Sequence, residues 1–374
     1  MRSTSPRRLP DADEAEQRRQ VAIRVLQRHL SEGICDALLV TYLPHVRYLS
    51  GFTGSNGWLL VRKRSTVLLT DPRYREQAEQ EVVGIRVHIV AGRTMTAALS
   101  NDGLLRHVRE LGVEAAHLDY VTFTNLRKSL DPVRLVALHD AVEEQRAVKF
   151  PDEIACIRRA VRISERVWEE ILPLLRPGVR EIEIAAEITY RQRLLGADGD
   201  AFPPIVLFGA RSSLIHGQPS TARLRAGQPV LMDFGCRVNG YVSDITRTVF
   251  LGGASRRMRA IYRVVRDAQE LGRSEIREGL PADALDRLVR TFIDEQGYGD
   301  YFEHGLGHGI GLEVHEQPTL SWRNSDPLES GAVVTIEPGV YVPGLGGVRI
   351  EDDMLVTDAG AQSLTGLTRE LVEL

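Results

Sequence analysis

Cysteine is scarce in this sequence of 374 residues, which holds only Cys35, Cys156 and Cys236. The three residues fall at no C-x-x-C or zinc-ribbon spacing, so they indicate neither a disulfide framework nor a thiolate-bound metal. Sparse, unpaired cysteine is typical of proteins that fold in a reducing compartment.

Long hydrophobic runs are missing as well. No stretch approaches the roughly 18 uncharged apolar residues that a membrane span requires, and the N-terminal region lacks the apolar core of a signal peptide. We therefore expect a polar leader over residues 1–12, no membrane partner and a cytoplasmic location.

A strong excess of charge of one sign is also absent. The chain has 47 basic and 51 acidic side chains, a net charge of −4, which gives no indication of a nucleic-acid partner. Its 43% hydrophobic and 26% charged residues exclude a disordered or collagen-like chain. At roughly 150 residues per domain the length predicts two domains. We place them at residues 13–147 and 148–374, because Pro151 suits the first turn of a new helix.

The spacing of apolar residues predicts an α/β first domain and an α+β second domain. In the first, strands are expected at residues 37–40, 57–61, 66–69 and 87–90, between helices at 13–29, 74–81 and 95–111. In the second, helices are expected from Pro151 and at 181–195, 256–272 and 281–296, with glycine-rich β segments at 204–208, 229–250, 302–314 and 333–356.

A first pair of carboxylates flanks a predicted hairpin turn. Asp233 ends an apolar run, Asp244 follows in the returning segment, and Asn239–Gly240 between them is typical of a two-residue hairpin loop. A four-residue loop would place Asp233 opposite Asp244, whereas the two-residue loop pairs Asp233 with Thr246. Side-chain alternation keeps both acids on one face in either register. In an isolated hairpin, the ordinary explanation would be a strand-end acid and an ion pair between Asp244 and Arg247.

The same pattern returns near the C-terminus. Glu337 follows the apolar run 333–336, and Glu351 stands 14 residues later, beyond a glycine-rich turn. An even separation requires a loop of odd length or a bulge if the two glutamates are to share a face. The repeat predicts two related halves whose four carboxylates converge. Their charges would repel in apolar surroundings unless a cation lay between them.

Three histidines lie between the two hairpins, at His304, His308 and His315. The spacing of the first two matches a zinc-protease H-E-x-x-H helix, but Gly305 stands where that motif needs its glutamate, and the surrounding glycines disfavour a helix. As a strand, the segment would place His304 and His308 on one face and glycines on the other, where another backbone must approach closely. His216 lies on a polar loop, and its role stays open at this level.

Four carboxylates and one imidazole form a hard, oxygen-rich ligand set. Such a set suits two divalent cations, with Mn²⁺ expected and Co²⁺, Zn²⁺ or Fe²⁺ as alternatives. Two cations about 3.5–4 Å apart activate a shared water and polarise a carbonyl, which is the chemistry of hydrolysis.

The residues around these acids and histidines resemble the pita-bread metallopeptidases, in the aminopeptidase P and prolidase branch that cleaves Xaa-Pro bonds. The resemblance covers the motifs at 233–235, 241–248, 304–311, 315–316 and 336–352. Residues 47–54 look like the short motif of the creatinase-type N-terminal domain. The resemblance implies an α/β creatinase-like N-terminal domain, an α+β pita-bread catalytic domain, a homodimer and a proline-containing peptide as substrate.

Carried onto this sequence, the resemblance also implies roles for individual residues. The metal ligands would be Asp233, Asp244, His308, Glu337 and Glu351, with Asp244 and Glu351 bridging both ions. Glu337 would also act as general base. The substrate and the oxyanion would be held by His216, His304 and His315, and Arg349 would orient the carboxylates.

Three positions depart from the family pattern. Relatives commonly carry Asn and Pro where this chain has Arg211 and Ile215, and many prolidases carry Arg where it has Thr319. Without that arginine, the site lacks one positive charge that could bind the free carboxylate of a dipeptide. We therefore expect an Xaa-Pro aminopeptidase, with an Xaa-Pro dipeptidase as the alternative. A catalytically silent pita-bread binding module is a third hypothesis, which the complete ligand set disfavours.

Overall fold

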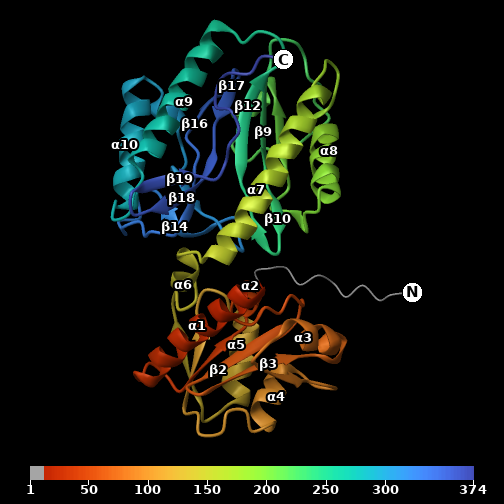
Figure 1. The fold of residues 1–374 in the computed structure, drawn as a ribbon, viewed down its shortest axis with the longest axis vertical. Helices are drawn as coiled ribbons and strands as arrows, with labels where there is room; N and C mark the ends of the chain where they lie inside the picture. The colour runs from red at the N-terminus through yellow and green to blue at the C-terminus, as the bar shows by residue number, and fades with distance from the viewer. Residues whose placement is uncertain (1–11) are drawn as a thin grey trace, which may run out of the picture. The chain divides into compact units, whose positions relative to one another are not determined.

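A computed structural model describes residues 12–374, which divide into two compact units between Gln145 and Arg146 (Figure 1). The predicted polar leader, apart from its last residue, lies outside the described residues. Within residues 12–374 no helix is long and apolar enough to cross a membrane. The three cysteines are free thiols, as their sparse spacing indicated.

The first unit is built on a six-stranded sheet in the order β4-β3-β2-β1-β5-β6. Its strands are β1 (Ala37–Val40), β2 (Gly57–Arg62), β3 (Ser65–Thr70), β4 (Arg86–Ile89), β5 (Glu110–Glu114) and β6 (Arg134–Leu138). Its helices are α1 (Ala12–Ser31), α2 (Leu43–Ser50), α3 (Arg75–Glu81), α4 (Met95–Asn101), α5 (Tyr120–Ser129) and α6 (Glu143–Ala147), which runs into the second unit. Strands β1, β5 and β6 are parallel, so their carboxyl ends share one edge of the sheet.

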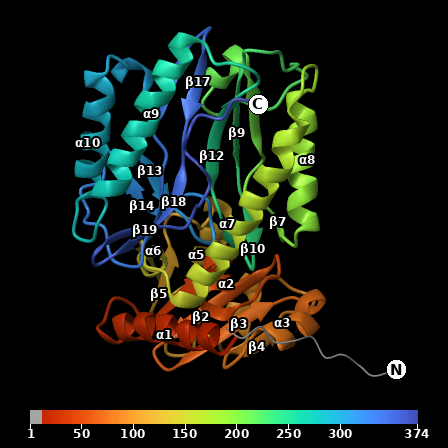
Figure 2. The same cartoon turned by 45° about the horizontal axis from the view of Figure 1, so that its top comes forward.

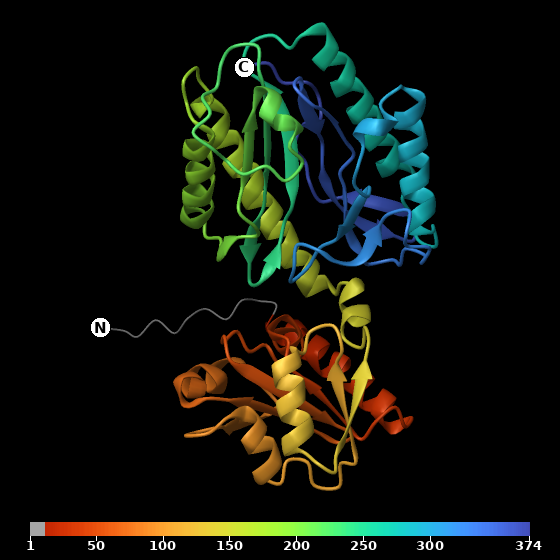
Figure 3. The same ribbon diagram turned by 180° about the vertical axis from the view of Figure 1, so that it is seen from behind.

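Helices cover both faces of this sheet, as expected for an α/β layer. Figure 1 shows α1 in front of the strands, and Figure 3, from behind, shows α5 in front of them. Figure 2 presents the same unit with α1 and α2 toward the viewer. Leu99 of α4 and Leu126 of α5 pack in one core cluster with Leu39 and Leu60. Burial on both faces explains why the central strand β1 is apolar and buried at every position.

The helix predicted over residues 95–111 is wrong beyond Asn101. Gly103 adopts a φ of +67°, in the left-handed region that ends a helix. Leu104 and Val108 are buried in the core from an irregular turn, and Leu111 belongs to β5. The helical spacing of these three residues therefore reflects their burial in the core and does not indicate a helix.

The second unit combines four long helices with short, highly bent β segments. Its helices are α7 (Pro151–Ile171), α8 (Glu181–Leu194), α9 (Arg256–Glu275) and α10 (Ala282–Glu295). Its first strands are β7 (Gly199–Asp200), β8 (Ile205–Phe208), β9 (Pro229–Phe234), β10 (Cys236–Val238), β11 (Tyr241–Val242) and β12 (Ile245–Phe250). The later strands are β13 (Gly307–Gly309), β14 (Glu316–Leu320), β15 (Val333–Ile336), β16 (Gly339–Val342), β17 (Gly346–Arg349), β18 (Asp352–Thr357) and β19 (Gly360–Ser363).

The helices of the second unit lie on one side of its strands. In Figure 1 α7 and α9 run in front of the strands, and in Figure 3 the strands face the viewer. Pro151 begins α7 as predicted, and the Glu153 carboxylate accepts the Phe150 N–H at 2.9 Å, which caps the helix. Two core clusters fill the space between helices and strands, one under α7 and α8 and one under α9 and α10.

Each acid-bearing segment folds as a long hairpin whose ladder is interrupted once. In the first, β9 pairs with β12 and β10 with β11 around the two-residue turn Asn239–Gly240, so Asp233 faces Thr246. In the second, β15 pairs with β18 and β16 with β17 around a loop of odd length, residues 343–345. The first hairpin thus has the two-residue loop and not the four-residue loop. The predicted loop of odd length in the second hairpin is confirmed.

The glycines around His308 allow the close approach that the sequence predicted. A Cβ atom on Gly307 would lie 2.0 Å from the Thr335 carbonyl oxygen, and one on Gly309 would lie 2.3 Å from that of Gln317. Strands β15 and β14 therefore contact the glycine face of β13 on either side.

Substituting Gly307 by alanine should destabilise the second unit by roughly 3 kcal/mol, because β15 must move to admit the methyl group. Chemical denaturation of Gly307→Ala against the parent protein measures this loss. Gly253→Ala is the matched control, since the nearest atom to its Cβ would be 4.0 Å away. Equal stability of the two variants would contradict the close packing.

Candidate metal centre

The predicted metal ligands stand where the two hairpins interrupt their ladders. Asp244, Glu337 and Glu351 occupy the short gaps between strand pairs, Asp233 lies near the end of β9, and His308 lies on β13. All five line one pocket of about 450 Å³. A residue in such a gap is free of the ladder, so its side chain can turn toward the pocket.

The ligand atoms are close enough to share cations. His308 Nε2 lies 3.3 Å from Glu337 Oε1 and 3.8 Å from Asp244 Oδ2. Single ligand atoms of Asp244, His308 and Glu351 all lie within 4.8 Å of one another.

The pocket holds more negative charge than its own side chains neutralise. Burial, and then repulsion from neighbouring carboxylates, raises the pKa of Asp244 and Glu351 well above their usual range. Burial alone would also raise the pKa of Glu337, but the hydrogen bond and charge of His308 lower it to about 2. Burial likewise raises the pKa of Asp233 in spite of Arg349. A cation would favour the ionised form of every one of these acids.

Three carboxylate oxygens in the pocket have no hydrogen-bond partner and are therefore available to bind a metal. Asp233 Oδ1, Asp244 Oδ1 and Glu351 Oε1 are buried and accept no hydrogen bond. The second oxygen of Glu351 accepts from Thr246 Oγ1 at 2.6 Å, so this carboxylate is already fixed in direction. An unpartnered buried oxygen costs about 1–3 kcal/mol, and a divalent cation removes that cost. The donor set therefore fits divalent metal ions.

Arg349 ties the two hairpins together beneath this cluster. Its guanidinium donates to the Asp233 carboxylate, to Thr246 Oγ1 at 3.0 Å and to the Tyr341 hydroxyl at 2.8 Å. The same hydroxyl lies 2.9 Å from His304 Nε2. Arg349 thus fixes a carboxylate from the first hairpin relative to its own strand in the second.

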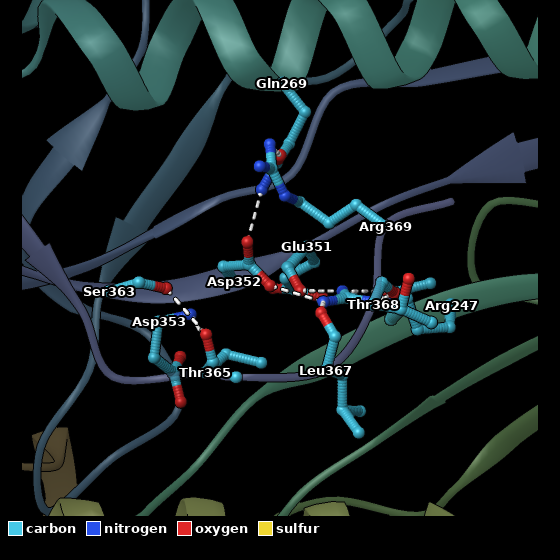
Figure 4. Close-up of polar contacts among 12 residues, drawn as sticks. Arg247, Gln269, Glu351, Asp352, Asp353, Ser363, Thr365, Leu367, Thr368 and Arg369 are labelled. Atoms are coloured by element: carbon cyan, nitrogen blue, oxygen red, sulfur yellow. Dashed lines mark hydrogen bonds and ion pairs between the residues drawn. The ribbon is translucent and has the colours of Figure 1, made fainter. Parts of the chain in front are cut away.

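Behind Glu351, a second buried arginine holds the returning strand in place (Figure 4). Arg247 donates to Asp352 Oδ1 at 2.6 Å and to the carbonyl oxygens of Leu367 and Thr368 at 2.9 Å each. The simple hairpin explanation, an ion pair between Asp244 and Arg247, is therefore wrong. Strand alternation turns the Arg247 side chain away from the pocket, toward Asp352.

The His216 loop is anchored by a buried carboxylate, Glu181. The loop follows the 3₁₀ helix Gly209–Ser213, and His216 lines the pocket. Glu181 accepts from the backbone N–H of Phe208 and of Ser220, each at 2.8 Å, and from Arg211 Nε at 3.1 Å. Arg211, one of the departures from the family pattern, therefore braces the loop and does not line the pocket.

His315 also lines the pocket, beside His308. Its ring centroid lies 4.3 Å from that of His308. The next residue, Glu316, is fixed by Lys149 at 2.8 Å and by Arg146. Burial lowers the pKa of both His304 and His315, which keeps these rings neutral near pH 7.

Apolar side chains also line the pocket. They belong to Phe202, Pro203, Pro204, Ile205, Ile215 and Val314. The pocket therefore presents both charged and hydrophobic groups, a lining that suits a small ligand with both kinds of surface.

The interrupted hairpins, the buried acids and the histidines define a metal-dependent hydrolase built on an α/β unit and an α+β unit. The chain belongs to metallopeptidase family M24, whose model matches residues 155–358. The creatinase/prolidase N-terminal domain matches residues 23–148. Family membership and the predicted fold class are confirmed, and the chain is a metallo-exopeptidase that uses divalent metal.

Three relatives show how far the similarity extends. The Xaa-Pro dipeptidase of Pyrococcus furiosus is 34% identical over 348 residues, 93% of this chain and 98% of its own. The solved Xaa-Pro dipeptidase from Bacillus anthracis is 38% identical with a TM-score of 0.92, covering 95% of this chain and 100% of its own. The solved X-Pro aminopeptidase from Thermotoga maritima is 36% identical with a TM-score of 0.86, covering 91% and 98%.

Several supporting residues were not anticipated from the sequence. Thr246 stands two residues after Asp244, so strand alternation could have placed it in the site. Glu181, Tyr341 and Asp352 had no such signal, because their roles depend on contacts between segments far apart in the chain.

Mn²⁺ added to chelator-treated protein should raise its melting temperature. At a metal concentration of about a hundred times Kd, the free energy of unfolding should increase by about 2.7 kcal/mol. In the metal-free state Asp244 and Glu351 retain protons that a cation must displace, because their pKa values are raised. The stabilisation should therefore be smaller near pH ~5.5 than near pH ~8. Calorimetry measures both effects. Asp244→Asn should respond weakly, and a metal-insensitive parent protein would contradict the fit.

Glu181→Ala should lower the free energy of unfolding by roughly 3 kcal/mol, because it leaves Arg211 and two backbone N–H groups without their acceptor. The looser His216 loop should also raise KM for a cleaved peptide. Glu187→Ala on the same helix is the control, since that side chain is 42% exposed and makes a surface ion pair with Arg191 at 3.2 Å. Loss of such a pair should change stability by about 0.5 kcal/mol or less. An unchanged KM in folded Glu181→Ala would show that the loop does not contact substrate.

Proposed function

We propose that this protein is an Xaa-Pro dipeptidase that works with two divalent cations, with Mn²⁺ as the expected metal. The observation that carries the proposal is a single pocket lined both by the carboxylate and histidine cluster and by apolar side chains. The relatives from P. furiosus and B. anthracis, both Xaa-Pro dipeptidases matching over nearly their full length, support the dipeptide as substrate. They favour the dipeptidase alternative over the aminopeptidase that the sequence led us to expect.

The residues around the pocket divide the work as follows. The apolar side chains of the pocket would receive the proline ring and exclude water from it. His216 and His315 line the pocket and would donate N–H groups to the carbonyl oxygen that gains charge. The neutral His304 ring already donates its Nδ1–H to the Gly305 carbonyl at 2.8 Å and pairs with the Tyr341 hydroxyl, so it would contact substrate through the face of its ring. Glu337 is ionised, so it can accept a proton from the attacking water and pass it to the leaving nitrogen.

The cations would be held by Asp233, Asp244, His308, Glu337 and Glu351. When bound, two divalent ions at this donor set activate water and polarise the substrate carbonyl. Arg349 and Thr246 keep Asp233 and Glu351 aimed at them, which limits the reorganisation required during turnover.

An Xaa-Pro aminopeptidase is the second candidate. Thr319, paired with His308 on the neighbouring strand, supplies no cation for the free carboxylate of a dipeptide. The similarity to the T. maritima X-Pro aminopeptidase points the same way. The homodimer also stays a prediction, and sedimentation of the purified chain tests it.

Purified protein loaded with Mn²⁺ should hydrolyse Gly-Pro and Leu-Pro, and it should cleave Gly-Pro-amide and Arg-Pro-Pro at least about tenfold more slowly in kcat/KM. The amide separates the two candidates because it lacks only the free carboxylate. Mass spectrometry of the products measures each reaction, and Glu337→Gln serves as the inactive control. Faster cleavage of the longer peptide would establish the aminopeptidase, and no cleavage of any Xaa-Pro bond would overturn both.

A further inference from the structure

A second cluster of metal-ligating side chains lies within the first unit. His45, His117 and Glu143 each offer one ligand atom, and these atoms lie within 4.8 Å of one another. His45 follows β1, His117 follows β5 and Glu143 follows β6. Those three strands are parallel, so their carboxyl ends deliver the three side chains to one edge of the sheet. Ligands of open α/β sheets bind at this kind of edge.

His45 is arranged as a metal-ligating histidine would be. Its Nδ1 lies 2.6 Å from Glu114 Oε1. The other oxygen of Glu114 accepts the backbone N–H groups of Thr41 and Tyr42 at 2.6 and 3.0 Å, so this carboxylate acts as an acceptor and the proton lies on His45 Nδ1. A carboxylate on the far nitrogen is the usual companion of a metal-bound imidazole, because it fixes the tautomer and the ring direction.

The remaining nitrogen of His45 has no partner. The side chain is 0% exposed, and its Nε2 makes no hydrogen bond. A buried acceptor without a donor costs about 1–3 kcal/mol. The lone pair on this nitrogen is therefore available, and the cluster around it contains the other two ligands.

His117 and Glu143 complete the cluster and connect it to solvent. His117 Nε2 lies 2.8 Å from Glu143 Oε1, and the two side chains are 22% and 20% exposed. The His117 ring stacks on Tyr42 at a centroid distance of 3.8 Å, which fixes its orientation. An ion can reach this side of the cluster, and it would replace the proton that the two side chains share.

We infer that His45, His117 and Glu143 form a zinc site in the first unit, separate from the dinuclear centre proposed for the second. Two imidazoles and one carboxylate are a common zinc ligand set, with the fourth position left for water. The nitrogen-rich set favours Zn²⁺ over Mn²⁺, whereas the oxygen-rich pocket of the second unit suits Mn²⁺. Because α6 begins at Glu143, zinc would also tie this helix to the sheet.

The test counts zinc in the full-length protein. Chelated protein is reloaded with excess Zn²⁺, desalted and measured by plasma mass spectrometry. His45→Gln/His117→Gln should bind one zinc fewer per chain than the parent, with unchanged cleavage of Xaa-Pro peptides by the Mn²⁺-loaded enzyme. His88→Gln is the matched control, because His88 also pairs with a carboxylate, Asp102, at 2.6 Å in the same unit but outside the cluster.

Glu143→Gln keeps the test decisive if the double histidine variant fails to fold. This side chain is partly exposed, so its replacement opens no cavity, and the variant should lose the same single zinc. Equal zinc content in the parent and in folded Glu143→Gln would overturn the inference. Loss of zinc with full peptidase activity supports it, and loss of all metal from both units would also overturn it.

Discussion

Mutual repulsion among four clustered carboxylates is the constraint on which the second unit depends. Burial raises the energy of every charged oxygen, and the acids face one another across a single pocket. Within the described residues, His308 and Arg349 supply the positive charge that faces them, and each makes contact with one carboxylate at hydrogen-bonding range. The fold therefore holds its acids in place by backbone interruption, by Thr246 and by Arg349, and it leaves the balance of charge to a cation.

Both hairpins turn their acidic side chains toward the pocket by the same interruption of the strand ladder. A continuous ladder would turn alternate side chains to opposite faces, whereas the gaps at Asp244 and at Glu337 and Glu351 free these residues to turn inward. Their backbone N–H groups then bond across segments, as Glu351 does with the Thr246 carbonyl at 3.1 Å and Glu337 with that of Leu306 at 2.9 Å. Each half of the site thereby depends on the other half for its geometry.

Local rules predicted most of the scaffold and much of the site. Asn239–Gly240 determined one hairpin register, and the even separation of Glu337 and Glu351 determined the parity of the other loop. Such rules failed where tertiary packing decides: the helix predicted beyond Asn101 ended early, and nothing near Glu181 indicated that it braces a distant loop. These rules also did not predict the length of the substrate. Thr319, where many prolidases have arginine, favoured an aminopeptidase, whereas the relatives favour a dipeptidase.

The bond between Arg247 and the carbonyl groups of Leu367 and Thr368 has a consequence for synthesis on the ribosome. The support behind Glu351 is incomplete until these late residues have left the exit tunnel. Phe250 N–H and Gly252 N–H likewise bond to the carbonyl groups of Val372 and Leu374. The peptidase centre therefore cannot take its final form before residues 367–374 are in place, whichever part of the second unit folds first.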